Sequence, residues 1–307
     1  MSYPLVTIGI PTYNQENYIQ QAIESALAQD YSNLEVVVAD DYSTDNTANI
    51  VSEYLNDIRF KYFKNSYNLG RVGNYKKLLY EYAQGDWYLN HDGDDFLVDN
   101  SFISTGIECI WGNKDIVLFQ ATHFREDNAG NRIQKSFPPT QLLTIVEGKD
   151  FLLNYPEKMG VQHLAALYDR KKAMELDFYR SDSLRSDSES ILRLALKGKV
   201  AFYNKAVGVW RDHGVNETWL LTEQTLTKEK AVFDAVASEA SGFIKSETLQ
   251  KWVKKVKENV DLYYIDSYMT QKPLFSNFKF FAGHFHLRLS YLRLFFKHLY
   301  NSLRFTK

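Results

Sequence analysis

Cysteine is almost absent from this sequence of 307 residues, in which Cys109 is the single example. An internal disulfide is therefore impossible, and a reducing compartment is expected. No stretch approaches the ~18 consecutive apolar residues that a membrane-spanning helix needs. The first residues pass directly into a strand-like pattern, without the basic region and apolar run of a secretory signal. Together these absences favour a cytoplasmic protein.

Net charge is also small, at −2, which argues against a nucleic-acid-binding protein. Acidic residues are nevertheless missing from the end of the chain, because no Asp or Glu follows Asp266. The cations beyond that point are Lys272, Lys279, Arg288, Arg293, Lys297, Arg304 and Lys307. This segregation of charge suggests that the tail has a role separate from that of the body.

Two common phosphate-binding loops are absent as well. A dinucleotide-binding site would place G-x-G-x-x-G after the first strand, where this chain has Gly-Ile-Pro-Thr-Tyr-Asn at residues 9–14. A Walker loop is also missing. An EF-hand beginning at Asp92 is excluded because the twelfth position would be Ile103 rather than Glu.

Strand-like and helix-like segments alternate over the first 95 residues. The predicted strands are residues 5–10, 34–39, 58–63 and 87–90, and helical spacing of apolar residues occupies 19–27, 50–55 and 75–82. Ser43 and Thr44 are expected to cap the second helix. Such alternation predicts right-handed βαβ units, and hence an α/β fold with a mainly parallel sheet flanked by helices.

The second half of the chain is less regular. The expected elements are a strand at 116–125, a polar loop at 126–140, a helix at 190–196, a strand at 200–203 and a mostly helical region at 222–269.

Polar residues follow the predicted strands, at the end where ligands bind in parallel sheets. They are residues 11–14, 40–41, 68–71 and 92–95. In Asp92-Gly93-Asp94, two carboxylates separated by a flexible glycine have the shape of a divalent-cation site. A plain Asp/Gly-rich turn has the same sequence signature, and Asp40-Asp41 is open to interpretation as a helix-capping turn.

The joint pattern from Val6 to Asp95 resembles the nucleotide-binding half of family-2 glycosyltransferases, which have the GT-A fold. The matching blocks are residues 6–14, 37–45, 68–70, 85–86 and 92–95, in the family's order and spacing. Tyr42 departs from the pattern, because a glycine is commoner there, and a modest change in turn geometry is expected. The resemblance implies inverting transfer of a sugar from a nucleoside diphosphate sugar to an acceptor hydroxyl.

The resemblance continues more faintly to about residue 218. Asp187 matches the family's catalytic base, although Ser186 stands where the family usually has Glu, and nearby Glu189 is an alternative base. The segment Trp-Arg-Asp-His at 210–213 is similar to the Arg-x-His segment that often closes over the diphosphate. An ordinary surface position is the alternative for His213.

The resemblance also implies roles for the site residues. Asp94, helped by Asp92 across Gly93, is expected to hold Mg²⁺ or Mn²⁺ against the diphosphate, with His213 as a further ligand. Asp41 is expected to accept a hydrogen bond from the nucleotide base, which favours a UDP-sugar or another uracil- or thymine-type donor. The remaining donor-binding residues are expected to be Pro11, Thr12, Tyr13, Asn14, Asn68 and Arg71. For Arg71, the solvated start of a helix is an equally good interpretation.

The expected domains are a GT-A domain at 1–218, divided into a nucleotide-sugar half (1–98) and an acceptor half (99–218), and a helical region at 219–307. An apolar stripe marks the tail: Phe285, Leu289, Leu292, Phe296, Leu299 and Leu303. Beside its cations, this face suits an anionic membrane surface, while docking on the body or pairing with another chain remain alternatives. An enzyme at the inner face of the cell membrane would suit a lipid-linked glycan acceptor, as in bacterial surface-polysaccharide synthesis.

Two rival functions use related chemistry. A catalytically silent sugar-nucleotide-binding or scaffold protein could share this fold, but it would not need Asp92, Asp94 and Asp187 together. A nucleotidyltransferase that makes sugar nucleotides would need a glycine-rich, lysine-containing loop after the first strand, and this loop is missing. A hexosyl- or N-acetylhexosaminyltransferase is therefore the favoured interpretation.

Overall fold

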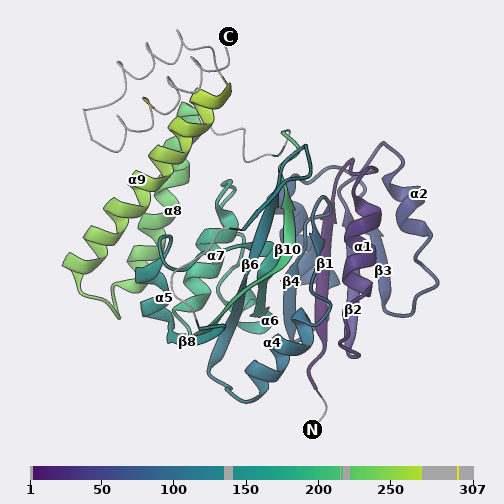
Figure 1. Ribbon diagram of the computed structural model, residues 1–307, viewed down its shortest axis with the longest axis horizontal. Helices are drawn as coiled ribbons and strands as arrows, with labels where there is room; N and C mark the ends of the chain where they lie inside the picture. Colours follow the sequence, from purple (N-terminus) through teal and green to yellow (C-terminus); the bar gives the residue numbers. More distant parts are fainter. Residues whose placement is uncertain (1–2, 135–140, 215, 217–221, 272–295, 297–307) are drawn as a thin grey trace.

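The computed structural model describes residues 3–134, 141–214, 216, 222–271 and 296. Its centre is a sheet with the strand order β3-β2-β1-β4-β9-β6-β10-β5, in which β7 also pairs with β6 and β8 with β10 (Figure 1). The strands are β1 (Val6–Thr12), β2 (Leu34–Asp40), β3 (Phe60–Lys64), β4 (Trp87–Asn90), β5 (Phe96–Leu97), β6 (Ile116–Glu126), β7 (Arg132–Gln134), β8 (Leu143–Glu147), β9 (Ala166–Asp169) and β10 (Lys199–Arg211). The α-helices are α1 (Ile19–Leu27), α2 (Thr47–Ser52), α3 (Arg71–Lys77), α4 (Phe102–Trp111), α5 (Gly148–Asn154), α6 (Arg170–Glu175), α7 (Ser186–Ala195), α8 (Glu223–Ala240) and α9 (Ser246–Gln271).

The N-terminal part of the sheet is parallel, as the alternation of strands and helices predicts. β1 pairs with β2 on one side and with β4 on the other, and β2 pairs with β3. Successive residues of a strand face opposite sides of the sheet, so Val36 and Val38 enter one hydrophobic core while Val37 and Ala39 enter the other. Burial on both faces explains why residues 36–39 of this strand form a continuous apolar run.

The second half makes the sheet mixed. β6 and β10 are parallel to each other, whereas β9 runs antiparallel to both β4 and β6. β10 extends to Arg211 and is much longer than the strand predicted at 200–203. Its length carries residues 210–213 to the same sheet edge as the end of β4, where the main chain of Arg211 bonds to the side chain of Asp95.

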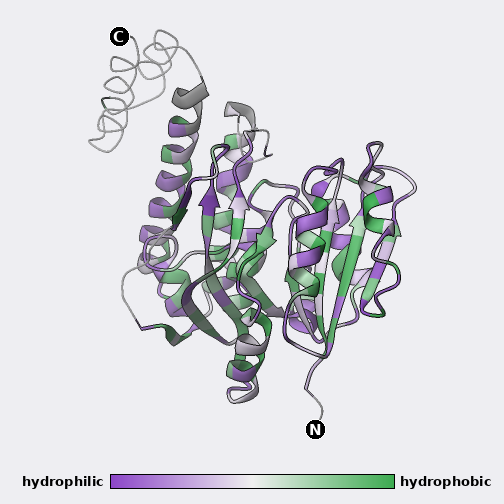
Figure 2. Cartoon of the chain, turned by 45° about the vertical axis from the view of Figure 1, so that its right-hand side comes forward, coloured by the Kyte–Doolittle hydropathy of each residue, from purple (hydrophilic) through white to green (hydrophobic). Residues whose placement is uncertain are grey.

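Helices α8 and α9 lie side by side on the flank of the sheet opposite α2 and β3 (Figure 1). Their buried residues Phe233, Val256 and Val260 belong to the same core as Ile191 of α7 and Phe151 of α5. In Figure 2 the strands are mostly hydrophobic, while α9 mixes hydrophilic and hydrophobic residues along its length. The core is thus continuous across residue 218, and a domain boundary at that point stays a prediction.

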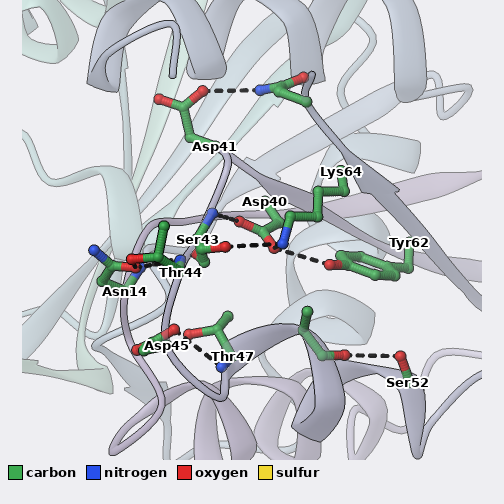
Figure 3. A network of polar contacts seen from close by, with 12 residues as sticks. Asn14, Asp40, Asp41, Ser43, Thr44, Asp45, Thr47, Ser52, Tyr62 and Lys64 are labelled. Carbon is green, nitrogen blue, oxygen red and sulfur yellow. Dashed lines mark hydrogen bonds and ion pairs between the residues drawn. The ribbon is translucent and has the colours of Figure 1, made fainter. Parts of the chain in front are cut away.

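The prediction that Ser43 and Thr44 cap a helix is wrong. α2 begins at Thr47, whose N–H donates to the Asp45 carboxylate at 3.0 Å. Ser43 and Thr44 instead bind Asn14, since the Asn14 N–H donates to Ser43 Oγ at 2.9 Å and the Thr44 N–H to Asn14 Oδ1 at 2.8 Å (Figure 3). Short polar side chains bind loop backbone readily. Here they join the loops that follow β1 and β2.

Tyr42 occupies the turn after β2 with a backbone φ of 70°, in the left-handed region. Glycine adopts this conformation freely, whereas a residue with a Cβ is strained by roughly 1–2 kcal/mol. The turn at Tyr42 therefore has a backbone conformation that a glycine would also adopt, and the Tyr42 side chain is exposed.

Parts of two predicted segments lie outside the described residues. The polar loop predicted at 126–140 contains β7, which pairs with β6, and its residues 135–140 are not described. The basic aromatic tail at 272–307 is not described either, apart from Phe296. Within the described ranges, no helix combines the length and the apolar character that crossing a membrane requires.

Candidate functional site

A cavity of about 1050 Å³ lies beyond the carboxyl ends of β1, β2 and β4. All but one of the predicted site residues line it: Pro11, Thr12, Tyr13, Asn14, Asp41, Asn68, Arg71, Asp92, Asp94, Asp187 and His213. The exception is Gly93. The position agrees with the rule that open α/β sheets bind ligands at this edge.

Gly93 allows the loop after β4 to pack closely against the end of β1. A Cβ at this position would lie 2.3 Å from Gln15 Oε1 and 3.2 Å from the Pro11 carbonyl oxygen. The Gly93 N–H also donates to that carbonyl, at 3.1 Å. The glycine thus permits a close approach that fixes the two neighbouring aspartates against β1.

Asp94 contacts the end of β10. Its Oδ2 lies 3.0 Å from Nε2 of His213, whose ring stacks on Tyr18 with centroids 5.1 Å apart. Arg211 donates a side-chain hydrogen bond to the Asp94 carbonyl at 2.6 Å, and its backbone N–H donates to Asp95 at 3.0 Å. The acidic loop and residues 211–213 are therefore in direct contact.

Asp92 is held by neighbours from α3 and β4. Its Oδ1 accepts hydrogen bonds from the Tyr75 hydroxyl at 2.7 Å and the Asn90 side-chain amide at 2.9 Å. Burial, reinforced by the charge of Asp94, raises the pKa of Asp92 to about 7. Ionising Asp92 is therefore costly, first because its carboxyl group is buried and second because the negative charge of Asp94 lies beside it.

The side chains at this loop can supply some of the ligands of a divalent cation, and a bound substrate would have to supply the others. Within the described part of the chain, no three His, Cys, Asp or Glu side chains converge to hold a metal by themselves. Carboxylates of the Asp92–Asp94 pair suit Mg²⁺ or Mn²⁺, and the imidazole of His213 suits a transition-metal ion better than Mg²⁺. Oxygens of a bound diphosphate would complete the coordination.

The adjacent aspartates after β2 occupy different environments (Figure 3). Asp40 is fully buried and accepts hydrogen bonds from the Tyr62 hydroxyl at 2.8 Å and the Ser43 N–H at 2.7 Å. Asp41 lines the cavity, and its Oδ1 accepts from the Asn65 amide at 2.9 Å and the Leu69 N–H at 2.8 Å. Neither caps α2, and only Asp41 lies at the cavity.

Arg71 begins α3, yet it is more than a solvated helix start. It lines the cavity, and its Nη2 donates to the Ser183 carbonyl at 2.8 Å. Its guanidinium also lies over the ring of Tyr75, 5.4 Å from the centroid. Arg71 thereby joins the donor half to the loop that precedes α7.

The two candidate bases on α7 lie in different environments. Asp187 lies in the first turn, where the helix dipole favours a negative charge, and it lines the cavity. Glu189 is only 2% exposed, does not line the cavity, and forms an ion pair of 2.6 Å with Arg180. The structure therefore brings Asp187 to the cavity and gives Glu189 a structural partner.

Several residues of α8 and α9 also line the cavity, which the sequence patterns did not predict. They include Glu229 and Phe233 of α8, and Asn259 and Tyr263 of α9. The sequence predicted only a mostly helical region at 222–269. It gave no information about which part of the molecule these helices cover, and no local motif marks these positions.

His163 is a second residue that no motif indicated. It lines the cavity, and its Nε2 lies 3.0 Å from the hydroxyl of Tyr179. Burial lowers the pKa of His163 to about 4, so the imidazole is neutral at physiological pH. This neutral ring contributes to the cavity wall without adding positive charge.

Curated relatives support the assignment that the residues suggested. Poly(ribitol-phosphate) β-N-acetylglucosaminyltransferase TarS of Staphylococcus aureus is 38% identical over 170 residues, which cover 50% of this chain and 30% of TarS. The UDP-Glc:α-D-GlcNAc-diphosphoundecaprenol β-1,3-glucosyltransferase WfgD of Escherichia coli is 36% identical over 120 residues, covering 37% of this chain and 47% of WfgD. The chain thus spans less than half the length of either protein.

Solved structures share the fold at low sequence identity. TarS residues 1–349 in complex with UDP-GlcNAc superpose with a TM-score of 0.63 at 18% identity, covering 96% of this chain and 79% of that one. The mannosyltransferase PcManGT of Pyrobaculum calidifontis, in complex with GDP-Man and Mn²⁺, gives a TM-score of 0.61 at 16% identity and covers 98% and 85%. These likenesses confirm the GT-A-type fold.

The sequence profile described as "Glycosyl transferase family 2" matches residues 7–176, which is more than half of the chain. The match contains both acidic loops that line the cavity, at Asp41 and at Asp92–Asp94. This chain belongs to glycosyl transferase family 2.

Proposed function

We propose that this chain transfers a hexosyl or N-acetylhexosaminyl group, with inversion, from a nucleoside diphosphate sugar to an acceptor hydroxyl. One observation carries the proposal: Asp94 and Asp187 come from different halves of the chain and line the same cavity. An acidic loop suited to a metal-bound diphosphate thus shares a cavity with a carboxylate suited to general-base catalysis.

In this mechanism Asp187 removes the proton of the acceptor hydroxyl while that oxygen attacks the anomeric carbon. A single displacement breaks the bond between sugar and phosphate and inverts the anomeric configuration. Asp94, with Asp92 and His213, would hold Mg²⁺ or Mn²⁺, which would neutralise the charge of the departing diphosphate. Arg71 adds a positive charge from the start of α3, and residues 11–14 with Asn68 flank the nucleoside.

The donor that we favour is a UDP-sugar. Asp41 uses its Oδ1 for Asn65 and Leu69 and remains part of the cavity lining. A carboxylate in this position suits the N–H of a uracil-type imide. TarS is described in complex with UDP-GlcNAc, whereas PcManGT is described with GDP-Man, so the fold by itself does not select the base.

The acceptor that we favour is a lipid-linked glycan of surface-polysaccharide synthesis at the inner face of the cell membrane. WfgD, as its name states, acts on a diphosphoundecaprenol-linked sugar. The cationic and apolar residues 272–307 would hold the enzyme at that surface.

Metal dependence is tested by chelation and by Asp94→Ala. Both should remove nearly all turnover of the donor sugar, because the charge of the leaving diphosphate is then left unneutralised. Asp99→Asn is a matched control, since Asp99 follows the same loop but pairs with Lys205 at 2.7 Å and does not line the cavity. Turnover is measured as release of nucleoside diphosphate, together with the melting temperature. Full activity in excess chelator would contradict the metal assignment.

Donor choice is tested by calorimetric titration of UDP, dTDP, GDP and CDP in the presence of Mn²⁺. We expect UDP or dTDP to bind best, and Asp41→Asn to weaken that binding by roughly 10-fold, since a charge-assisted hydrogen bond becomes a neutral one. Asp45→Asn changes a carboxylate of the same loop that does not line the cavity, and should leave binding unchanged. Binding of GDP or CDP alone would show that the role given to Asp41 is wrong.

The catalytic base is tested by comparing Asp187→Asn with Glu189→Gln. Asp187→Asn should retain donor binding and lower the transfer rate by ~10²–10⁴-fold, the usual effect of losing a general base. Glu189→Gln should lower stability, because Arg180 loses one of its two charged partners, while the rate stays near that of the wild type. The reverse pattern, with a normal rate in Asp187→Asn, would move the base elsewhere.

Membrane association is tested by co-sedimentation of the full-length chain with vesicles. Anionic phosphatidylglycerol vesicles should bind it and neutral phosphatidylcholine vesicles should not, and salt should weaken the binding. Replacing Arg293, Lys297 and Arg304 with Ser should weaken it by about 10²-fold, given about 1 kcal/mol per cation near the surface. A chain that ignores both kinds of vesicle would instead favour docking of the tail on the body or on another chain.

A further inference from the structure

The turn that leads into α7, the helix that carries Asp187, is fixed from two sides. Arg71, on the donor half, donates to the Ser183 carbonyl at 2.8 Å, and the Ser186 N–H donates to the same carbonyl at 3.1 Å. Within the turn, the Arg185 N–H donates to Ser183 Oγ at 3.0 Å. Asp187 follows immediately, so the position of its carboxylate depends on the conformation of these residues.

The second side is provided by one carboxylate of α8. Glu229 Oε2 accepts a hydrogen bond from the Ser183 hydroxyl at 2.7 Å, and its Oε1 accepts from the Leu184 N–H at 3.0 Å. Glu229 is 1% exposed, so solvent contributes little to stabilising its charge. A buried carboxylate is costly unless it is fully hydrogen-bonded. Each of its oxygens already has a donor from this turn, which leaves Glu229 poorly suited to contact the substrate directly.

We propose that Glu229 is a positioning residue for Asp187. Its two charge-assisted hydrogen bonds fix the Ser183–Leu184 turn, and the turn fixes the first residues of α7, including the base. Helix α8 is therefore part of the catalytic apparatus although it contributes no reacting group. This proposal rests on the proposed function, because it assumes that Asp187 is the base.

The same helix offers a matched control. Glu239, near the end of α8, also joins α8 to the acceptor half, through ion pairs with Arg193 at 2.6 Å and Arg180 at 3.1 Å. Both arginines lie outside the turn that precedes Asp187, Arg180 before it and Arg193 after it, and Glu239 does not line the cavity. Both glutamates attach α8 to the body, but only Glu229 bonds to the turn that carries the base.

The experiment compares Glu229→Ala, Glu229→Gln and Glu239→Gln in the full-length chain, with donor-sugar hydrolysis as the activity. We expect Glu229→Ala to lower kcat by roughly 10²-fold, the usual effect of a small misplacement of a catalytic group, with donor KM unchanged. Glu229→Gln keeps one accepting oxygen and should recover part of the rate. Glu239→Gln should lower the melting temperature without changing kcat. A Glu229→Ala variant with normal kcat, or a loss of rate that merely follows the loss of stability in both glutamate variants, overturns the proposal.

A second measurement does not depend on activity. Hydrogen exchange should show that amides of residues 183–187 are protected in the wild type and lose protection in Glu229→Ala but not in Glu239→Gln. Unchanged exchange in Glu229→Ala overturns the proposal even if the enzyme is active. A wild-type protein that turns over no nucleotide sugar contradicts the proposed function instead, and the exchange result still decides whether Glu229 holds the turn.

Discussion

Repulsion between carboxylates at the end of β4 is the constraint on which the rest of the site depends. Asp92, Asp94 and Asp95 crowd into four residues, and burial together with the charge of Asp94 raises the pKa of Asp95 well above its usual range. Each carboxylate has a different partner, and these partners come from α3, from β4 itself and from the end of β10. These partners hold the loop in place from both halves of the sheet.

This dependence connects the two halves of the molecule. His213 and Arg211 reach the acidic loop because β10 is long, and Arg71 reaches the base turn because α3 begins at the sheet edge. Polar contacts therefore form between segments more than one hundred residues apart in the sequence. The same contacts hold the cavity residues in position and pack the two halves of the molecule against each other.

The sequence predicted the first four strands, and nearly all of the site residues that it predicted line the cavity, because their signals are local. An apolar run followed by polar residues marks a strand end, and parallel pairing brings such ends together. The full extent of β10 was not predictable in this way, since its apolar pattern is broken by Asn204 and Lys205 and its pairing with β6 has register shifts. Ser43 and Thr44 were misassigned because a loop 29 residues away offered them better partners than the helix did.

The choice between Asp187 and Glu189 required tertiary structure. Both residues are acidic and lie in the first turn of one helix, but only Asp187 lines the cavity, whereas Glu189 is buried and paired with Arg180. The contribution of α8 and α9 required it as well, because an amphipathic helix shows that one of its faces is buried but not what that face covers.

The origin of the cavity walls also affects how this protein must fold during synthesis. The strands that line the donor side are complete once β4 has been made, but the last wall residue described, Tyr263, is made more than 170 residues later. A chain emerging from the ribosome therefore holds its acidic loop without β10, α8 or α9 for many seconds at usual translation rates of ~5–20 residues per second. Contacts of such long sequence separation slow folding. Until α9 docks, the apolar face that it covers is open to other proteins, so molecular chaperones have most to protect while the final third of this chain is being made.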